Sequence, residues 1–182
     1  MKEFDRFELL LWLIERFDNL RASVSNNASI VVSANALLIA ALTFFLGTIT
    51  NPASSFPPNV KTWAILCCAT SFVSLMVSIY LSVNAIANVF KTSRQLIKSD
   101  VPPRFFFNQR ETLEKWKSVD AFSKNFCEMD AEKFLELGIA ELWAISVTQN
   151  KRYSSLRWSI RFFVAALLPL AIAVGMVLFA AS

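Results

Sequence analysis

The sequence contains no histidine, and its three cysteines have no metal-binding or redox spacing. Without histidine, imidazole metal ligands and the serine–histidine or cysteine–histidine pairs of many hydrolases are excluded. Cys67 and Cys68 are adjacent inside an apolar stretch and Cys127 stands alone, so we expect reduced, structural thiols. These absences predict a protein that is not an enzyme and that needs no metal or cofactor.

Glycine is equally scarce, with three residues far apart in the chain: Gly47, Gly138 and Gly175. A phosphate-cradling loop needs several glycines within a few positions, so P-loop and dinucleotide-binding turns are excluded. The formal net charge is +4. In a membrane chain such an excess is typical of cytoplasmic segments that meet anionic lipid, so we expect membrane lipid as a partner and no direct nucleic-acid binding.

Charged residues are absent from three long stretches, residues 22–60, 62–90 and 162–182. About 20 mostly apolar residues suffice to cross a bilayer, and 55% of this chain is apolar. The sequence therefore predicts an all-α membrane protein with three transmembrane helices, at residues 28–49, 62–90 and 158–182. No charge lies deep in any span, which disfavours a proton relay or an ion-coupled transporter.

The N-terminal residues 1–27 are expected to form an amphipathic cytoplasmic helix. Acidic residues interrupt any apolar run there, which excludes a signal peptide. Apolar side chains recur at helical spacing: Phe4, Phe7, Leu10, Leu11, Ile14, Phe17 and Leu20. Because residues 25–27 contain no helix breaker, the helix is predicted to continue into the first span.

Turn-forming residues divide the remainder of the chain. Residues 50–61 include three prolines and are predicted to be an extracytoplasmic loop. Residues 91–157 are predicted to be a cytoplasmic helical insert. Apolar periodicity in the second half of this insert runs on into the last span, so one helix is expected over residues 131–179, with Pro169 as its kink.

The distribution of lysine and arginine predicts the orientation in a bacterial inner membrane. Thirteen of these residues lie between positions 91 and 161 and four between 1 and 21, whereas the proline loop contains only Lys61. Basic residues favour the cytoplasmic side. The N-terminus is therefore expected in the cytoplasm and the C-terminus outside it.

Small and amide side chains recur within the first two spans, and they form the candidate polar seam. Serines in membrane helices usually permit close packing, and buried amides must be hydrogen-bonded or hydrated. The seam is therefore either a packing surface or a partly hydrated axis in a homo-oligomer. Its candidate residues are Ser29, Ser33, Asn35, Ser74, Ser78, Ser82 and Asn84.

Four basic residues form a candidate collar just before the last span: Lys151, Arg152, Arg157 and Arg161. Such collars usually bind lipid phosphates and fix topology, and a phosphate-bearing signal is the alternative ligand. Acidic residues on the preceding helix, Asp130, Glu132 and Glu136, are expected to form ion pairs on a solvated face.

The chain has an amphipathic first helix that leads through the Asn-rich residues 19–29 into a span, then a hairpin and a cytoplasmic insert. Lys151, Tyr153 and Arg157 follow just before the last span. This order resembles the Pycsar transmembrane effector family, and SLATT-type effectors look similar. The resemblance implies anti-phage defence by abortive infection, in which a partner protein or nucleotide signal triggers an oligomer to form pores or otherwise disrupt the inner membrane.

A second function is compatible with the same sequence. A non-conducting anchor or sensor subunit would hold and regulate a soluble partner protein through the insert. Permeabilisation predicts depolarisation on triggering, whereas an anchor predicts loss of the partner from the membrane without leakage.

Overall fold

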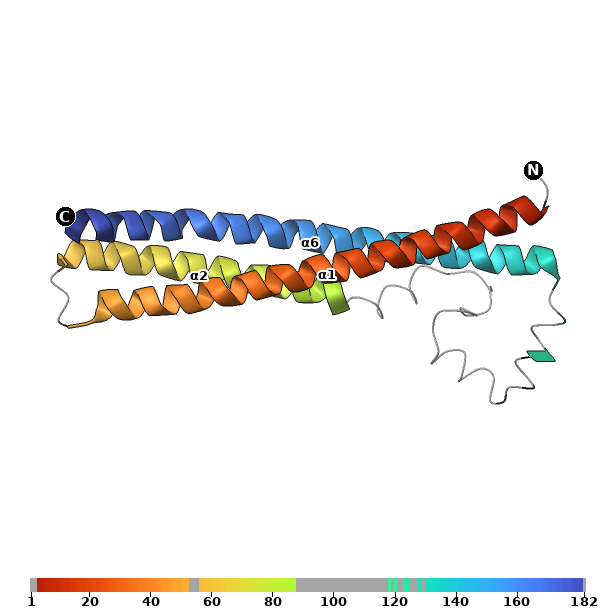
Figure 1. Ribbon diagram of the computed structural model, residues 1–182, viewed down its shortest axis with the longest axis horizontal. Helices are drawn as coiled ribbons and strands as arrows, with labels where there is room; N and C mark the ends of the chain where they lie inside the picture. The colour runs from red at the N-terminus through yellow and green to blue at the C-terminus, as the bar shows by residue number, and fades with distance from the viewer. Residues whose placement is uncertain are drawn as a thin grey trace. The chain divides into compact units, whose positions relative to one another are not determined.

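The computed structural model describes residues 3–52, 56–87, 118, 120, 123–124, 128 and 130–181, with three long helices (Figure 1). They are α1 (Glu3–Thr50), α2 (Pro58–Ala87) and α6 (Ala131–Ala181). Each is long and apolar enough to cross a membrane, and no strand occurs in the described ranges. The predicted all-α fold with three membrane-spanning helices is confirmed.

Helix boundaries follow the local turn chemistry. As predicted, α1 passes residues 25–27 without a break, and α6 continues through Pro169. The second helix begins at Pro58, earlier than the predicted start at residue 62. The Lys61 amide donates to the Pro57 carbonyl at 3.1 Å, and proline suits the first helical turn because its missing N–H needs no partner there.

The chain divides into two compact units. The first contains residues 1–21 and 89–150, and the second contains residues 22–88 and 151–182. Most of residues 91–129 of the predicted cytoplasmic insert lie outside the described residues, whereas its last part, residues 131–157, is helical. In the first unit, Leu10 of α1 packs against Gly138 of α6, and Gly138 has no side chain to obstruct that contact.

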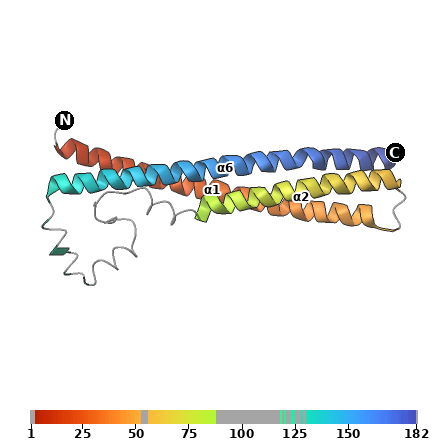
Figure 2. The ribbon, with the colours of Figure 1, turned by 180° about the vertical axis from the view of Figure 1, so that it is seen from behind.

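The second unit is a three-helix bundle, with its segments of α1, α2 and α6 side by side (Figure 2). The chain reverses between α1 and α2, and α6 runs parallel to α1. The buried residues of α2 follow a heptad pattern, with alternating intervals of four and three: Ala64, Cys68, Ser71, Leu75, Ser78, Ser82 and Ala85. This spacing is typical of left-handed helix packing.

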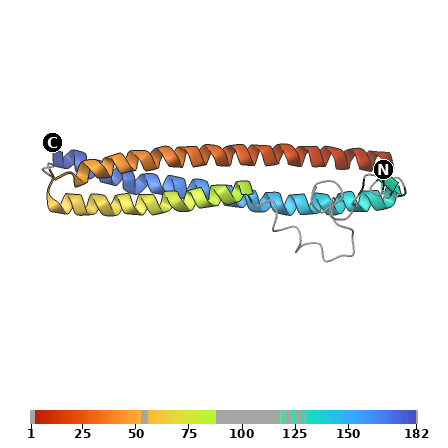
Figure 3. The same ribbon diagram turned by 90° about the horizontal axis from the view of Figure 1, so that it is seen from below.

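Buried residues of the other two helices recur with the same period, and the three helices of the bundle run along one another (Figure 3). Residues one heptad apart therefore group into four layers. All twelve residues are at most 3% exposed. Grouped by heptad position from the end nearest the loop, the layers are Ile49–Ala64–Ala173, Leu42–Ser71–Ala166, Asn35–Ser78–Ser159 and Ala28–Ala85–Arg152, and shared clusters and hydrogen bonds link members of each layer.

Most buried side chains of the bundle are small, and many of its large apolar side chains are exposed. Leu37, Phe44 and Phe179 are 74%, 80% and 85% exposed, respectively. Apolar surface gains nothing by leaving lipid, so membrane helices associate through close backbone approach and hydrogen bonds. This size distribution fits a bundle surrounded by acyl chains.

Candidate functional site

The centre of the candidate site is Asn35, which is fully buried among the three helices of the bundle. Its Nδ2 group donates to the Val31 carbonyl of α1 at 2.7 Å and to Ser78 Oγ of α2 at 3.0 Å. The first bond is local and the second joins two helices. Both amide protons are therefore used.

Serine hydroxyls extend this network to α6. Ser78 Oγ donates to the Ser159 carbonyl at 2.9 Å, and Ser159 Oγ donates to the Ser78 carbonyl at 2.7 Å. Ser82 Oγ lies 2.6 Å from Ser159 Oγ and donates to it, because the Ser159 proton is already used. We call Asn35, Ser78, Ser82 and Ser159 the polar layer.

One polar atom of this layer remains without a partner. Among the described residues, no group donates to the buried Asn35 Oδ1. Leaving a buried acceptor unsatisfied costs about 1–3 kcal/mol. In the polar layer, every hydrogen-bond donor therefore has an acceptor, whereas one acceptor, Asn35 Oδ1, has no donor.

The layers on either side contain further polar contacts. Ser71 Oγ donates to the Ala166 carbonyl at 2.9 Å, which joins α2 to α6 nearer the loop. On the other side, Arg152 is buried, and its Nη2 donates to the Ile86 carbonyl at 2.5 Å. Ile86 lies in the last described turn of α2, and the oriented carbonyls at the C-terminal end of a helix favour a cation.

The structure divides the predicted polar seam. It brings Asn35, Ser78 and Ser82 together, whereas Ser29 and Ser33 are exposed on another face of α1. Ser29 Oγ donates to the Ser25 carbonyl of its own helix at 3.0 Å. The remaining seam residues, Ser74 and Asn84, are half-buried.

The predicted basic collar is divided as well. Lys151, Arg157 and Arg161 are exposed, whereas Arg152 points into the bundle. Two of the exposed cations lie over aromatic rings of α6. Arg157 Cζ is 5.4 Å from the Tyr153 ring centroid, and Arg161 Cζ is 4.7 Å from that of Trp158. This surface suits a bilayer interface, where aromatic rings and cations gather.

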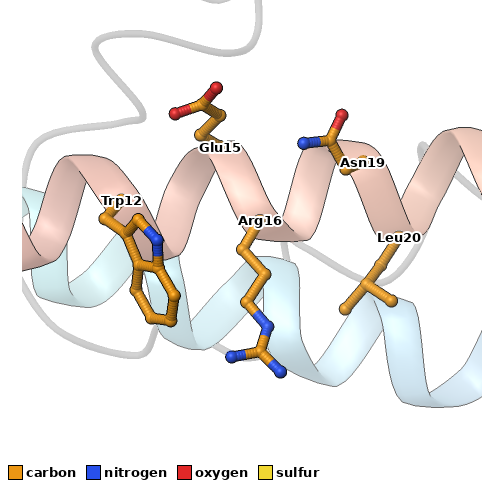
Figure 4. Close-up of a pocket in the computed structure, with 5 residues that line it drawn as sticks. All are labelled: Trp12, Glu15, Arg16, Asn19 and Leu20. Carbon is orange, nitrogen blue, oxygen red and sulfur yellow. The ribbon is translucent and has the colours of Figure 1, made fainter.

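A hollow lies beside the part of α1 that belongs to the first unit. It is lined by Trp12, Glu15, Arg16, Asn19 and Leu20. Figure 4 shows that Trp12, Arg16 and Leu20 point to one side, and Glu15 and Asn19 to the other. Arg16 Cζ lies 5.3 Å from the Trp12 ring centroid. Among the described residues, the lining comes from α1.

A comparison with known protein families gives a match over most of the chain. The family model described as Pycsar effector protein domain matches residues 9–179. The chain belongs to this family. No curated protein and no solved structure matches it significantly. The family resemblance inferred from the sequence is confirmed, and the protein is a membrane effector of anti-phage defence.

The match covers all of the polar layer of this Pycsar effector. Three of its four residues belong to the predicted polar seam, and Ser159 does not. A detectable signal was the heptad series Arg152, Ser159, Ala166 and Ala173, in which every side chain except the arginine is small. No group of three potential metal-ligating side chains occurs in the described part of this effector.

Proposed function

We propose that this Pycsar effector forms a homo-oligomer that permeabilises the bacterial inner membrane when infection provides a trigger. The observation that carries the proposal is the buried polar layer within the membrane-spanning bundle. An apolar layer would suffice for an inert anchor, whereas hydrogen-bonding groups at this depth provide a lining that water can wet.

The proposed orientation places the N-terminus and residues 91–157 in the cytoplasm and the C-terminus outside. It is supported by the concentration of lysine and arginine between positions 91 and 161. Arg157 and Arg161, each over an aromatic ring, then lie at the inner membrane surface, where lipid phosphates are abundant. A trigger that acts on residues 91–157, either a partner protein or a nucleotide signal, meets the bundle at this end.

Self-association is supported by the outward face of α1. At heptad spacing, this exposed face presents only small side chains: Ser29, Ser33, Ala36, Ala40, Thr43 and Gly47. Ser29 and Thr43 donate to carbonyls of their own helix, so their hydroxyls are satisfied without a partner chain. Such faces permit close helix contact between copies in a membrane.

The test is membrane potential, measured with a voltage-sensitive dye in bacteria that express the chain with its neighbouring genes. Depolarisation that follows phage infection and requires this chain is expected. A constant potential during infection, together with loss of a soluble partner from the membrane when the chain is deleted, would replace the proposal with the anchor function.

A further inference from the structure

The polar layer lies between two apolar clusters of the bundle. One cluster contains Leu42, Ile49, Ala64, Cys68 and Ala173, and the other contains Val24, Ala28, Ala85 and Leu156. In the two clusters the helices are held together by apolar packing. In the layer between them they are held together by hydrogen bonds, which water can replace. The layer is therefore the part of the bundle where hydration costs least.

The distribution of protons makes the layer receptive to a further donor. Both Asn35 amide protons and the single proton of each serine hydroxyl are engaged. No donor within the polar layer can therefore reach Asn35 Oδ1 without giving up one of these bonds. Water is a small donor that satisfies Oδ1 and replaces the interhelical bonds of the serines as the helices separate.

Arg152 lies in the layer next to the polar layer. It lies one heptad from Ser159, and it ties α6 to the last turn of α2 through the Ile86 carbonyl. At the corresponding positions of α1 and α2, Ala28 and Ala85 leave room for the long side chain. Ser78 lies on α2, and Ser159 lies on α6 together with Arg152. Moving the end of α2 away from Arg152 would therefore also draw Ser78 away from Ser159.

We propose that the polar layer is the gate of the bundle, that water binding at Asn35 opens it, and that Arg152 is the latch that holds it closed. This inference rests on the proposed permeabilising function. It adds three points to that function. The bundle opens at the polar layer, water is the ligand there, and Arg152 transmits movement at the end of α2 to this layer.

The first experiment measures the layer without a trigger. In the full-length protein purified in detergent, Asn35→Leu, Ser78→Ala, Ser82→Ala and Ser159→Ala are combined to make an apolar layer of similar size. If the layer is the weak point, the thermal unfolding midpoint rises by several degrees. Ser71→Ala is the control, because it removes one buried hydroxyl from the next layer, and its midpoint is expected to stay equal or fall. A fall for the combined variant would overturn the gate.

The second experiment measures leakage of a trapped dye from vesicles of phosphatidylethanolamine and phosphatidylglycerol that contain the full-length protein. Arg152→Leu is expected to leak at least several-fold faster than the original protein, and adding the four apolar substitutions is expected to abolish the increase. Equal leakage by Arg152→Leu and the original protein would overturn the latch. Leakage that persists with the apolar layer would overturn the gate.

A third measurement follows water itself. With Cys67, Cys68 and Cys127 replaced by alanine, Ser78→Cys is expected to react with a membrane-impermeant thiol reagent many-fold faster when Arg152→Leu is present. Ser71→Cys serves as the reference position, and equal slow labelling at both positions would contradict hydration of the layer. The proposed permeabilising function is tested separately, by the membrane potential of infected cells. An unchanged potential would contradict that function independently of the unfolding midpoints and the labelling rates.

Discussion

At the scale of single residues, the contribution of a side chain to the stability of the bundle depends on its neighbours. Ser159 uses its carbonyl, its hydroxyl oxygen and its hydroxyl proton to contact Ser78 and Ser82. Ser154, on the same helix, is exposed. The two serines are chemically identical, and only the first joins two helices.

We therefore predict that Ser159→Ala destabilises the protein by about 1–2 kcal/mol, because it leaves the Ser82 hydroxyl and the Ser78 carbonyl without their α6 partners. Ser154→Ala removes an exposed hydroxyl and is expected to change stability by less than about 0.5 kcal/mol. Unfolding in mixed detergent micelles measures both. Equal values for the two variants would show that the network makes no net contribution.

Residue identity alone predicts only part of the polar layer. Asn35 and Ser78 were recognised because polar groups in a span need partners. Ser33 was grouped with Asn35, yet two positions along a helix correspond to about 200° around its axis, so the two side chains face apart. Which of two polar residues faces inward is determined by the packing of the other helices, which composition does not contain.

At the scale of helices, the register between helices determines which residues meet. The sequence predicts Arg152 as part of the basic collar, and Ser159 belongs to neither the predicted seam nor the collar. In the structure, their spacing of seven residues places both on the inner face of α6. The continuity of α1 follows from the lack of breakers at residues 25–27, and α6 continues through Pro169 as its apolar periodicity predicts. The start of α2 depends on Pro58 as the first helical residue.

The contact between Leu10 and Gly138 gives a second prediction. A valine at position 138 would meet the Leu10 side chain, so Gly138→Val is expected to destabilise the packing of residues 3–21 on 131–150 by about 1–3 kcal/mol. Hydrogen exchange of amides in these two segments should accelerate. Gly175→Val is the control, since no atom lies within 4 Å of the added Cβ. Equal exchange in both variants would contradict the importance of this contact.

The outward face of α1 gives a third prediction, which depends on the proposed homo-oligomer. Ala36→Leu combined with Ala40→Leu is expected to weaken self-association at least about tenfold, or about 1.4 kcal/mol, because the added side chains keep helices apart. Cross-linking in membranes measures the oligomer. Leu37→Phe enlarges an exposed position off this face and should have no effect. Unchanged association of the double variant would exclude the face from the interface.

At the scale of the whole molecule, the three spans and the basic residues between them define the relationship to the membrane. The sequence predicted the number of spans correctly because uninterrupted apolar length is a strong signal. The proposed trigger and the proposed oligomer would depend on other molecules and on surfaces that hydropathy does not describe. The proposed orientation rests on the charge distribution and has its own test.

We predict that Asn59→Cys, at the exposed start of α2, reacts with an impermeant thiol reagent in intact cells whose outer membrane has been made permeable. Ser154→Cys, exposed on α6, should react only after the inner membrane is opened. The native cysteines are first replaced by alanine. The reverse pattern would place the N-terminus outside the cytoplasm and would invert the proposed orientation.

The four buried layers have a consequence for the choice of lipid. Three heptads separate the Ile49 layer from the Arg152 layer, a rise of about 31 Å along an α-helix, and the hydrocarbon core of a typical bilayer is about 30 Å thick. A membrane with longer acyl chains would draw the guanidinium into hydrocarbon, and one with shorter chains would bring headgroups to the packed end near the proline loop. For the latch proposed above, acyl-chain length would set how firmly Arg152 is seated, and bilayer thickness would adjust the threshold of the proposed opening.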